Sequence, residues 1–242
     1  MQNLQKFYID GQWVAPQSSK KMPVVNPATE EVIGEVILGN EEDVNIAVKA
    51  AKNAFMSFSK TSKEERMKIL KNIRKISEER FDDLADAMTM EMGAPRKMSR
   101  EAQADAAIGH LDGFISALEK HEEKIELSNT DILLKEPIGV CGLITPWNWP
   151  INQITLKVLP VIATGCTCIL KPSEHTPLSA MVYAEILDKA GVPAGVFNLV
   201  HGDGEGVGIA MSRHPDIEMM SFTGSKRAVS YTHLTLPTST HG

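Results

Sequence analysis

The sequence has no hydrophobic run long enough to cross a membrane. Its most apolar stretch, residues 158–170, is interrupted by Pro160 and Gly165 and is shorter than the roughly 18–20 residues that a spanning helix needs. The first residues lack a basic segment followed by an apolar one, so they indicate no secretory signal. Only three cysteines occur, too few for a disulfide scaffold and typical of a reducing compartment. We therefore expect a cytoplasmic protein without a membrane partner.

An excess of basic residues is also missing. The 25 Lys and Arg are outnumbered by 31 Asp and Glu, giving a formal net charge of −6, which argues against a dedicated nucleic-acid-binding protein. What is present is an ordinary globular composition, 43% hydrophobic and 23% charged, in 242 residues. That length suits one large or two modest domains with a real hydrophobic core.

The amino-terminal part, residues 1–125, is the more highly charged. Asp10-Gly11 separates two short apolar segments and is typical of a type I′ hairpin turn. Extended segments are predicted at 24–27 and 32–36, and from Asn40 apolar residues recur at the three- and four-residue steps of a helix. Ser62 and Glu65 form a capping-box pattern for the next helix. Two further helices are predicted at 82–92 and 97–119.

The second part, residues 126–228, alternates strand and helix patterns. Helices are predicted at 151–161, at 205–211 and from Pro177, as its first helical residue, to Lys189. The predicted strands are 132–134, 140–144, 166–170, 196–200 and 217–221. Repeated βα units with short connections imply an α/β fold with a doubly wound parallel sheet, whose ligands bind at the carboxyl ends of the strands.

The loop after the strand ending at Ile144 is rich in proline and tryptophan. Asn148 lies between Trp147 and Trp149, and its uncharged amide could stabilise an oxyanion. The alternative is that the tryptophans pack and Asn148 caps the next helix.

The loop after Leu170 contains Lys171, Ser173 and Glu174. A lysine and a carboxylate three residues apart could clasp ribose hydroxyls, and the carboxylate would repel a 2′-phosphate, which favours NAD over NADP. The alternative is a surface turn with an ordinary ion pair.

Two further loops contain small residues. The segment 201–208 has four alternating glycines, but no register matches the dinucleotide fingerprint, and Asp203 and Glu205 would repel a pyrophosphate. It is better interpreted as close packing of a helix against a strand or a flat ring. The loop after Ser221 begins a helix with small, hydroxyl-bearing residues whose N–H groups suit a phosphate.

Together these loops resemble the NAD(P)-dependent aldehyde dehydrogenase superfamily. The matching motifs are ITPWNWP, ILKPSE, HGDGEGVG and SFTGS, and the resemblance extends over residues 7–228. It implies a variant Rossmann sheet without the usual glycine signature. It also implies that Asn148 belongs to an oxyanion hole and that Lys157 acts in a proton relay near the nicotinamide ribose. The cofactor-binding residues that it implies are Ile144, Thr145, Pro146, Trp147, Lys171, Ser173, Glu174, Gly204, Gly208, Thr223, Gly224 and Ser225.

The implied reaction is oxidation of a small-molecule aldehyde to a carboxylic acid, in a homo-oligomer. In the family, the nucleophilic cysteine and the general-base glutamate follow the SFTGS segment, and here the pattern departs at Val229. Residues 229–242 are interpreted as a tail foreign to the family, so the chain by itself is expected to be inactive. Its three cysteines match structural positions and are expected to be inert; Cys166-x-Cys168 lacks the second ligand pair of a zinc site, and we expect no metal.

Two other classes of function stay open. The chain could be a stand-alone dinucleotide-binding module, which NAD would protect from unfolding. It could instead be a non-enzymatic interaction protein that uses the helices of residues 40–125, in which case changing Glu174 or Ser225 would have no measurable effect.

Overall fold

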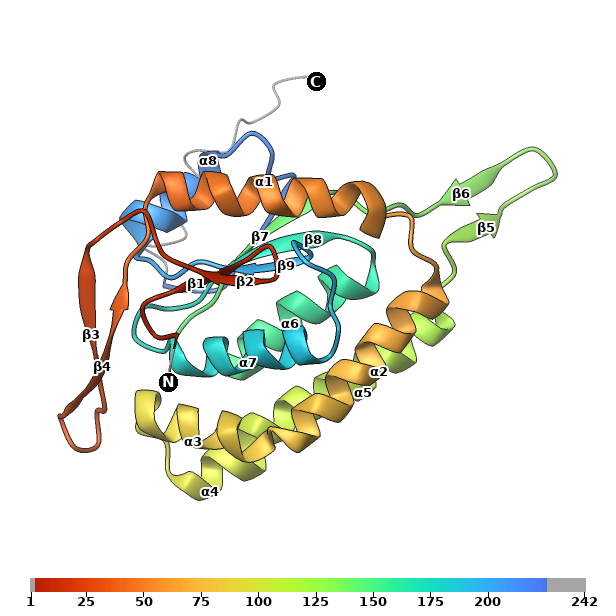
Figure 1. The fold of residues 1–242 in the computed structure, drawn as a ribbon. Coiled ribbons are helices and arrows are strands. Elements are labelled where there is room, and N and C mark those ends of the chain that lie inside the picture. The colour runs from red at the N-terminus through yellow and green to blue at the C-terminus, as the bar shows by residue number, and fades with distance from the viewer. Residues whose placement is uncertain (1–2, 226–242) are drawn as a thin grey trace.

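The computed structural model describes residues 3–225 (Figure 1). The predicted tail, 229–242, lies outside the described residues. A six-stranded sheet of order β10-β7-β8-β9-β1-β2 forms the centre. Its parallel strands are β7 (Val140–Ile144), β8 (Thr167–Lys171), β9 (Phe197–Leu199) and β10 (Met219–Phe222).

The amino-terminal hairpin completes this sheet. β1 (Phe7–Ile9) pairs with β2 (Gln12–Val14) across the predicted turn, where Asp10 and Gly11 have φ of 53° and 74°. Positive φ at both central residues is what a type I′ turn requires. β1 also pairs with β9 in the antiparallel direction, so the hairpin extends the parallel sheet by two strands beyond β9.

Helices cover both faces of the sheet. On one face lie α1 (Glu41–Phe58), the π-helical turn η2 (Gly204–Gly208) and α8 (Ile209–Arg213); on the other lie α6 (Pro150–Ala163) and α7 (Leu178–Lys189). Helices α2 (Lys63–Glu79), α3 (Phe81–Met92) and α5 (Asp105–Lys120) form a further layer outside α6 and α7. The prediction of an α/β fold with a doubly wound parallel sheet is confirmed.

The sheet separates two apolar cores because successive side chains of a strand point to opposite faces. Cys168 and Leu170 of β8 contribute to the core beneath α6 and α7, whereas Ile169 between them packs with Val44 and Val48 of α1. All five residues of β8 are buried, as expected for a central parallel strand.

The helix ends in the amino-terminal part have local caps, of which the Ser62–Glu65 box was predicted. Asn40 caps α1, and its side chain accepts hydrogen bonds from the N–H groups of Glu42 and Asp43. Ser62 and Glu65 form the predicted capping box of α2. α3 ends at Gly93, which has the left-handed φ of 70°.

Three predicted details are wrong. The helix predicted at 97–119 is interrupted: α4 (Arg96–Met98) leads into a π-helical turn, η1 (Ser99–Ala104), before α5. The wider turn accompanies burial of Ser99 and Gln103 beside α3, where the Thr89 hydroxyl donates to Ser99 at 2.9 Å. The helix predicted at 205–211 is also π-helical in its first part, η2, where Asp203 caps glycine-rich backbone. Pro177 is the N-cap of α7 rather than its first helical residue.

Two small hairpins stand apart from the central sheet. One is formed by β3 (Lys21–Val25) and β4 (Val32–Ile37), and the other by β5 (Lys124–Glu126) and β6 (Ile132–Leu134). The β5–β6 hairpin projects from the body, and all three side chains of β6 are exposed (Figure 1). No helix among residues 3–225 is long and apolar enough to span a membrane.

Candidate functional site

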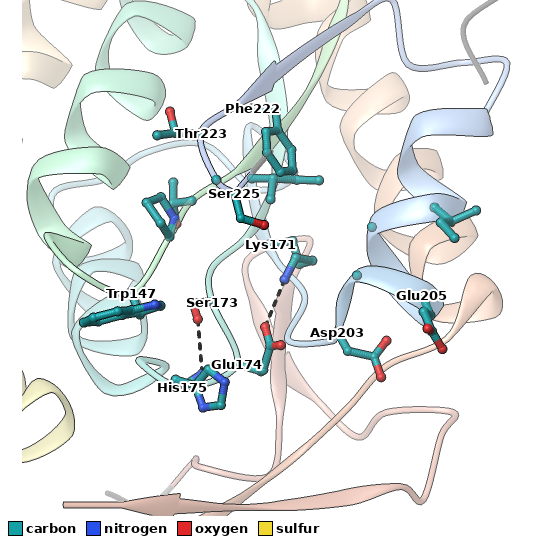
Figure 2. Close-up of a pocket in the computed structure, with 17 residues that line it drawn as sticks. Trp147, Lys171, Ser173, Glu174, His175, Asp203, Glu205, Phe222, Thr223 and Ser225 are labelled. Atoms are coloured by element: carbon teal, nitrogen blue, oxygen red, sulfur yellow. Dashed lines mark hydrogen bonds and ion pairs between the residues drawn. The ribbon is translucent and has the colours of Figure 1, made fainter. Parts of the chain in front are cut away.

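A pocket of about 460 Å³ opens at the carboxyl ends of the four parallel strands (Figure 2). Each strand end contributes residues, because parallel strands meet the same edge of the sheet with the same end. The lining comes from the segments 144–147, 171–175, 203–209 and 222–225. The four loops that the sequence singled out therefore converge on one cavity.

At the end of β8, Lys171 is buried at 4% exposure beside the half-buried Glu174. Its ammonium group donates to the carbonyl oxygens of Gly202 at 2.9 Å and Pro172 at 3.2 Å, and it lies 3.4 Å from Glu174 Oε2. Burial lowers the pKa of Lys171, while the charge of Glu174 opposes that shift. The pair thus places an ammonium group and a carboxylate side by side at the pocket wall.

After β9, Asp203 holds the start of the glycine turn. Its carboxylate caps η2 by accepting a hydrogen bond from the Gly206 N–H at 2.7 Å and pairs with Lys20 at 2.9 Å. Burial alone would raise the pKa of Asp203, but the bonds from Lys20 and Gly206 outweigh it and the pKa is lowered. Asp203 is therefore a fixed negative charge at the pocket wall.

The glycines of this turn have two different roles. A Cβ on Gly202 would lie 2.3 Å from Val207 Cγ2, and one on Gly206 would lie 3.0 Å from the Gly39 carbonyl oxygen, so both permit close packing. A Cβ on Gly204 would meet nothing within 4 Å, and one on Gly208 only atoms at ordinary contact distance. The interpretation as close packing thus applies to Gly202 and Gly206, whereas Gly204 and Gly208 line the pocket.

The loop after β7 forms another wall. Thr145 is buried, and its Oγ1 has no hydrogen-bond partner among the described residues. Trp147 is 56% exposed at the rim, and Pro146 lies between the two. Asn148 is exposed and is not part of the lining.

The end of β10 completes the pocket with Phe222, Thr223, Gly224 and Ser225. The Thr223 N–H donates to the Ile144 carbonyl at 3.1 Å, which ties this segment to the end of β7. One residue earlier in β10, Ser221 accepts a hydrogen bond of 2.8 Å from Lys157 of α6, outside the lining. Partial burial lowers the pKa of Lys157.

All twelve residues to which the sequence resemblance gave a cofactor role line this pocket, and the two given a catalytic role do not. Their binding roles remain predictions. The lining residues that the sequence reasoning left without a role are His175, Asp203, Glu205, Ile209 and Phe222. Each is within one residue of a predicted one, and extending each motif by one position would have found them.

The pocket wall carries hydrogen-bond donors and acceptors: one lysine, three carboxylates, one histidine and the hydroxyl groups of serine and threonine, beside apolar side chains. This set suits a polar organic ligand with hydroxyl groups. Among residues 3–225 no group of three or more His, Cys, Asp or Glu side chains is arranged to hold a metal ion. The three cysteines are buried elsewhere, and none lines the cavity.

Comparison with known proteins identifies the class. A model of the aldehyde dehydrogenase family matches residues 13–234. The chain is 49% identical to the 3-succinoylsemialdehyde-pyridine dehydrogenase of a Pseudomonas species over 229 residues, covering 94% of this chain and 48% of that protein. The chain belongs to the aldehyde dehydrogenase family.

Solved structures agree with this assignment. An aldehyde dehydrogenase from Bartonella henselae superposes with a TM-score of 0.93 at 46% identity, covering 96% of this chain and 49% of the other. A mutant aldehyde dehydrogenase C from Pseudomonas syringae, in complex with NAD+ and octanal, gives 0.95 at 48% identity, covering 97% and 48%. The chain thus spans about half the length of the relatives it matches.

Proposed function

We propose that this chain is the NAD-binding half of an aldehyde dehydrogenase and that the pocket in Figure 2 holds the dinucleotide. The observation that carries the proposal is the convergence of the Lys171–Glu174 pair, the Gly204–Gly208 turn and the loops after β7 and β10 on one cavity. The whole protein would oxidise a small-molecule aldehyde to a carboxylic acid.

The residues present fit this cofactor. Glu174 offers a carboxylate and Lys171 an ammonium group for ribose hydroxyls, and the space before Gly204 is open. Thr145 Oγ1 is a buried polar atom at the wall that still lacks a partner among residues 3–225. The lining carboxylates of Glu174, Asp203 and Glu205 would repel an added 2′-phosphate, which favours NAD+ over NADP+.

The chemistry that NAD+ supplies when bound is acceptance of a hydride. Within this chain, Asn148 would donate its amide N–H groups to an oxyanion, a role that its exposed position in the loop after β7 leaves open to substrate. Lys157 would exchange a proton, since partial burial makes its ammonium more acidic and its bond to Ser221 fixes its position. The nucleophile and general base would come from outside the described residues.

Cytoplasmic location and homo-oligomeric assembly of the whole protein belong to the same proposal. Three free, buried cysteines suit a reducing compartment. The projecting β5–β6 hairpin exposes Leu127, Ile132 and Leu134 at 65%, 53% and 60%, an apolar surface suited to pairing with a second copy.

Cofactor binding by the 242-residue chain tests the proposal. NAD+ should raise its unfolding temperature, and NADP+ should do so much less. Loss of a hydrogen bond to a charged group costs roughly 1.5–3 kcal/mol, so Glu174→Gln should weaken NAD+ binding roughly 10- to 100-fold and reduce the preference over NADP+. Glu101→Gln, an exposed carboxylate outside the pocket, is the control. Equal binding by wild type and Glu174→Gln, or no stabilisation of wild type, would contradict the proposal.

A further inference from the structure

Glu91, in the last turn of α3, carries a carboxyl group buried away from the pocket. The residue is 3% exposed and is not part of the pocket lining. Burial raises the pKa of Glu91 to about 8, and hydrogen bonds from Ser179 and Leu178 oppose that shift. The last turn of a helix also disfavours a negative charge, because its carbonyl oxygens form the negative end of the helix dipole. Neither burial nor α3 itself favours a glutamate at this position, so the reason for it lies in its contacts.

The Glu91 carboxyl group reaches the start of α7, which packs beside α3 (Figure 1). Its Oε2 accepts a hydrogen bond from the Leu178 N–H, and its Oε1 accepts one from the Ser179 N–H at 3.1 Å. The first N–H groups of a helix have no partner within the helix, and in α7 the first such bond is donated by Met181, to the Pro177 carbonyl. Pro177 is the N-cap, and its side chain makes no capping bond. Glu91 therefore supplies, from a neighbouring helix, the cap that the local sequence of α7 lacks.

The segment that leads from β8 into α7 forms one wall of the pocket, because Lys171 and residues 173–175 line the cavity. At its start, the Lys171 carbonyl accepts a hydrogen bond from the Thr145 N–H at 3.2 Å. At its end are the two bonds to Glu91. Within the described part of the chain, every hydrogen bond of residues 172–176 is made inside the segment itself, Lys171 included. Glu91 is thus the second of two hydrogen-bonded anchors for this wall.

We propose that Glu91 is a positioning residue of the pocket: by capping α7 it fixes the carboxyl end of the segment 171–177 and holds this wall in the shape that receives the dinucleotide. Without the cap, the segment would be anchored at one end and would populate more conformations. Apparent affinity falls in proportion to the fraction of molecules that are competent to bind. The nature of the ligand rests on the proposed function, whereas the anchoring does not.

Amide hydrogen exchange in the folded 242-residue chain measures the anchoring directly. In wild type, the N–H groups of Leu178 and Ser179 should exchange as slowly as the helical N–H of Met181, although N–H groups in the first turn of a helix ordinarily lack a partner. Glu91→Gln keeps the size of the side chain but replaces one accepting oxygen with an NH2 donor. At least one of the two N–H groups should then exchange roughly 10-fold faster. Fast exchange of both groups in wild type, a result that no folding defect can cause, would overturn the proposal, and so would unchanged rates in the variant.

Calorimetric titration with NAD+, at a temperature where every protein is folded, measures the consequence for the pocket. Glu91→Gln should bind NAD+ roughly 10-fold more weakly than wild type. Leu111→Val is the control, because it trims a fully buried side chain of α5, which packs on α2 and α6. It should lower the unfolding temperature but leave the affinity for NAD+ within about twofold of that of wild type.

The two measurements separate failure of this proposal from failure of the proposed function. If wild type binds NAD+ and Glu91→Gln binds it equally well, the positioning role is refuted while the proposed function stands. The positioning role is also refuted if Leu111→Val weakens binding as much as Glu91→Gln does, since loss of stability alone would then account for both. If wild type does not bind NAD+, the proposed function fails, and the exchange rates at Leu178 and Ser179 decide whether Glu91 holds the segment.

Discussion

Lowering the pH should destabilise the folded chain through His201, the residue that follows β9. Its imidazole is 1% exposed, lies near the Phe7 ring, and has no hydrogen-bond partner at either nitrogen within residues 3–225. Burial, together with the nearby charge of Lys171, lowers its pKa from 6.5 to about 3. The folded state therefore keeps a neutral ring at any pH above about 3, while the unfolded chain binds a proton below about 6.5.

The sign and size follow from proton linkage. Where the unfolded state binds more protons, stability falls as pH falls, so the loss begins near pH 6.5 and continues toward the folded pKa. With those two values, the free energy of unfolding should decrease by about 2 kcal/mol between pH 7 and pH 5 through this group alone. That is a large share of the stability of about 5–15 kcal/mol that a folded domain usually has.

Urea unfolding of wild type and His201→Gln at pH 7 and pH 5 isolates this contribution, because other titrating groups cancel in the difference. Glutamine keeps a buried polar side chain but cannot titrate in this range. The stability difference between the two proteins should shift by about 2 kcal/mol in favour of the variant at the lower pH. His175→Gln, at an exposed position of the pocket rim, should leave the pH dependence as in wild type. A constant difference between wild type and His201→Gln would refute the reasoning.

Two further predictions use matched pairs. Arg66→Met should lower the free energy of unfolding by about 3–5 kcal/mol, because the Arg66 side chain is 3% exposed and binds two carbonyl oxygens and Glu123. Arg74→Met in the same helix should leave urea unfolding nearly unchanged, because the partners of Arg74 are at the surface. Equal effects of the two variants would show that burial does not decide the outcome. Gly191→Ala should lower the free energy of unfolding by about 1–2 kcal/mol, because Gly191 has a left-handed φ of 81°, although a Cβ there would meet no neighbour. Gly195→Ala should lower it clearly more, because Gly195 has a φ of 77° and its Cβ would also lie 2.7 Å from the Ala50 carbonyl oxygen. Thermal unfolding in which the two glycine variants match would contradict that steric argument.

Local signals predicted the elements that depend on local chemistry. The predicted turn at Asp10-Gly11 and the predicted capping box of α2 rest on interactions within a few residues, and both are present. The structure adds two equally local helix ends, the Asn40 cap of α1 and the left-handed Gly93 after α3. The π-helical turn η1 was missed because it accompanies the burial of Ser99 beside α3, a contact between helices that no periodicity encodes. β5 was missed because its residues are Lys-Ile-Glu, with only the isoleucine partly buried.

The pocket was largely predictable for a topological reason. Once four strands are recognised as parallel, their carboxyl ends must share an edge, so four separate loops become neighbours without any knowledge of side-chain contacts. The effect of charge was harder to predict. From the sequence, the negative charges of Asp203 and Glu205 argued against a phosphate-binding loop, yet both residues line the pocket. Asp203 is held at the pocket by an ion pair with Lys20, which comes from a loop distant in sequence. Only the fold shows that partner.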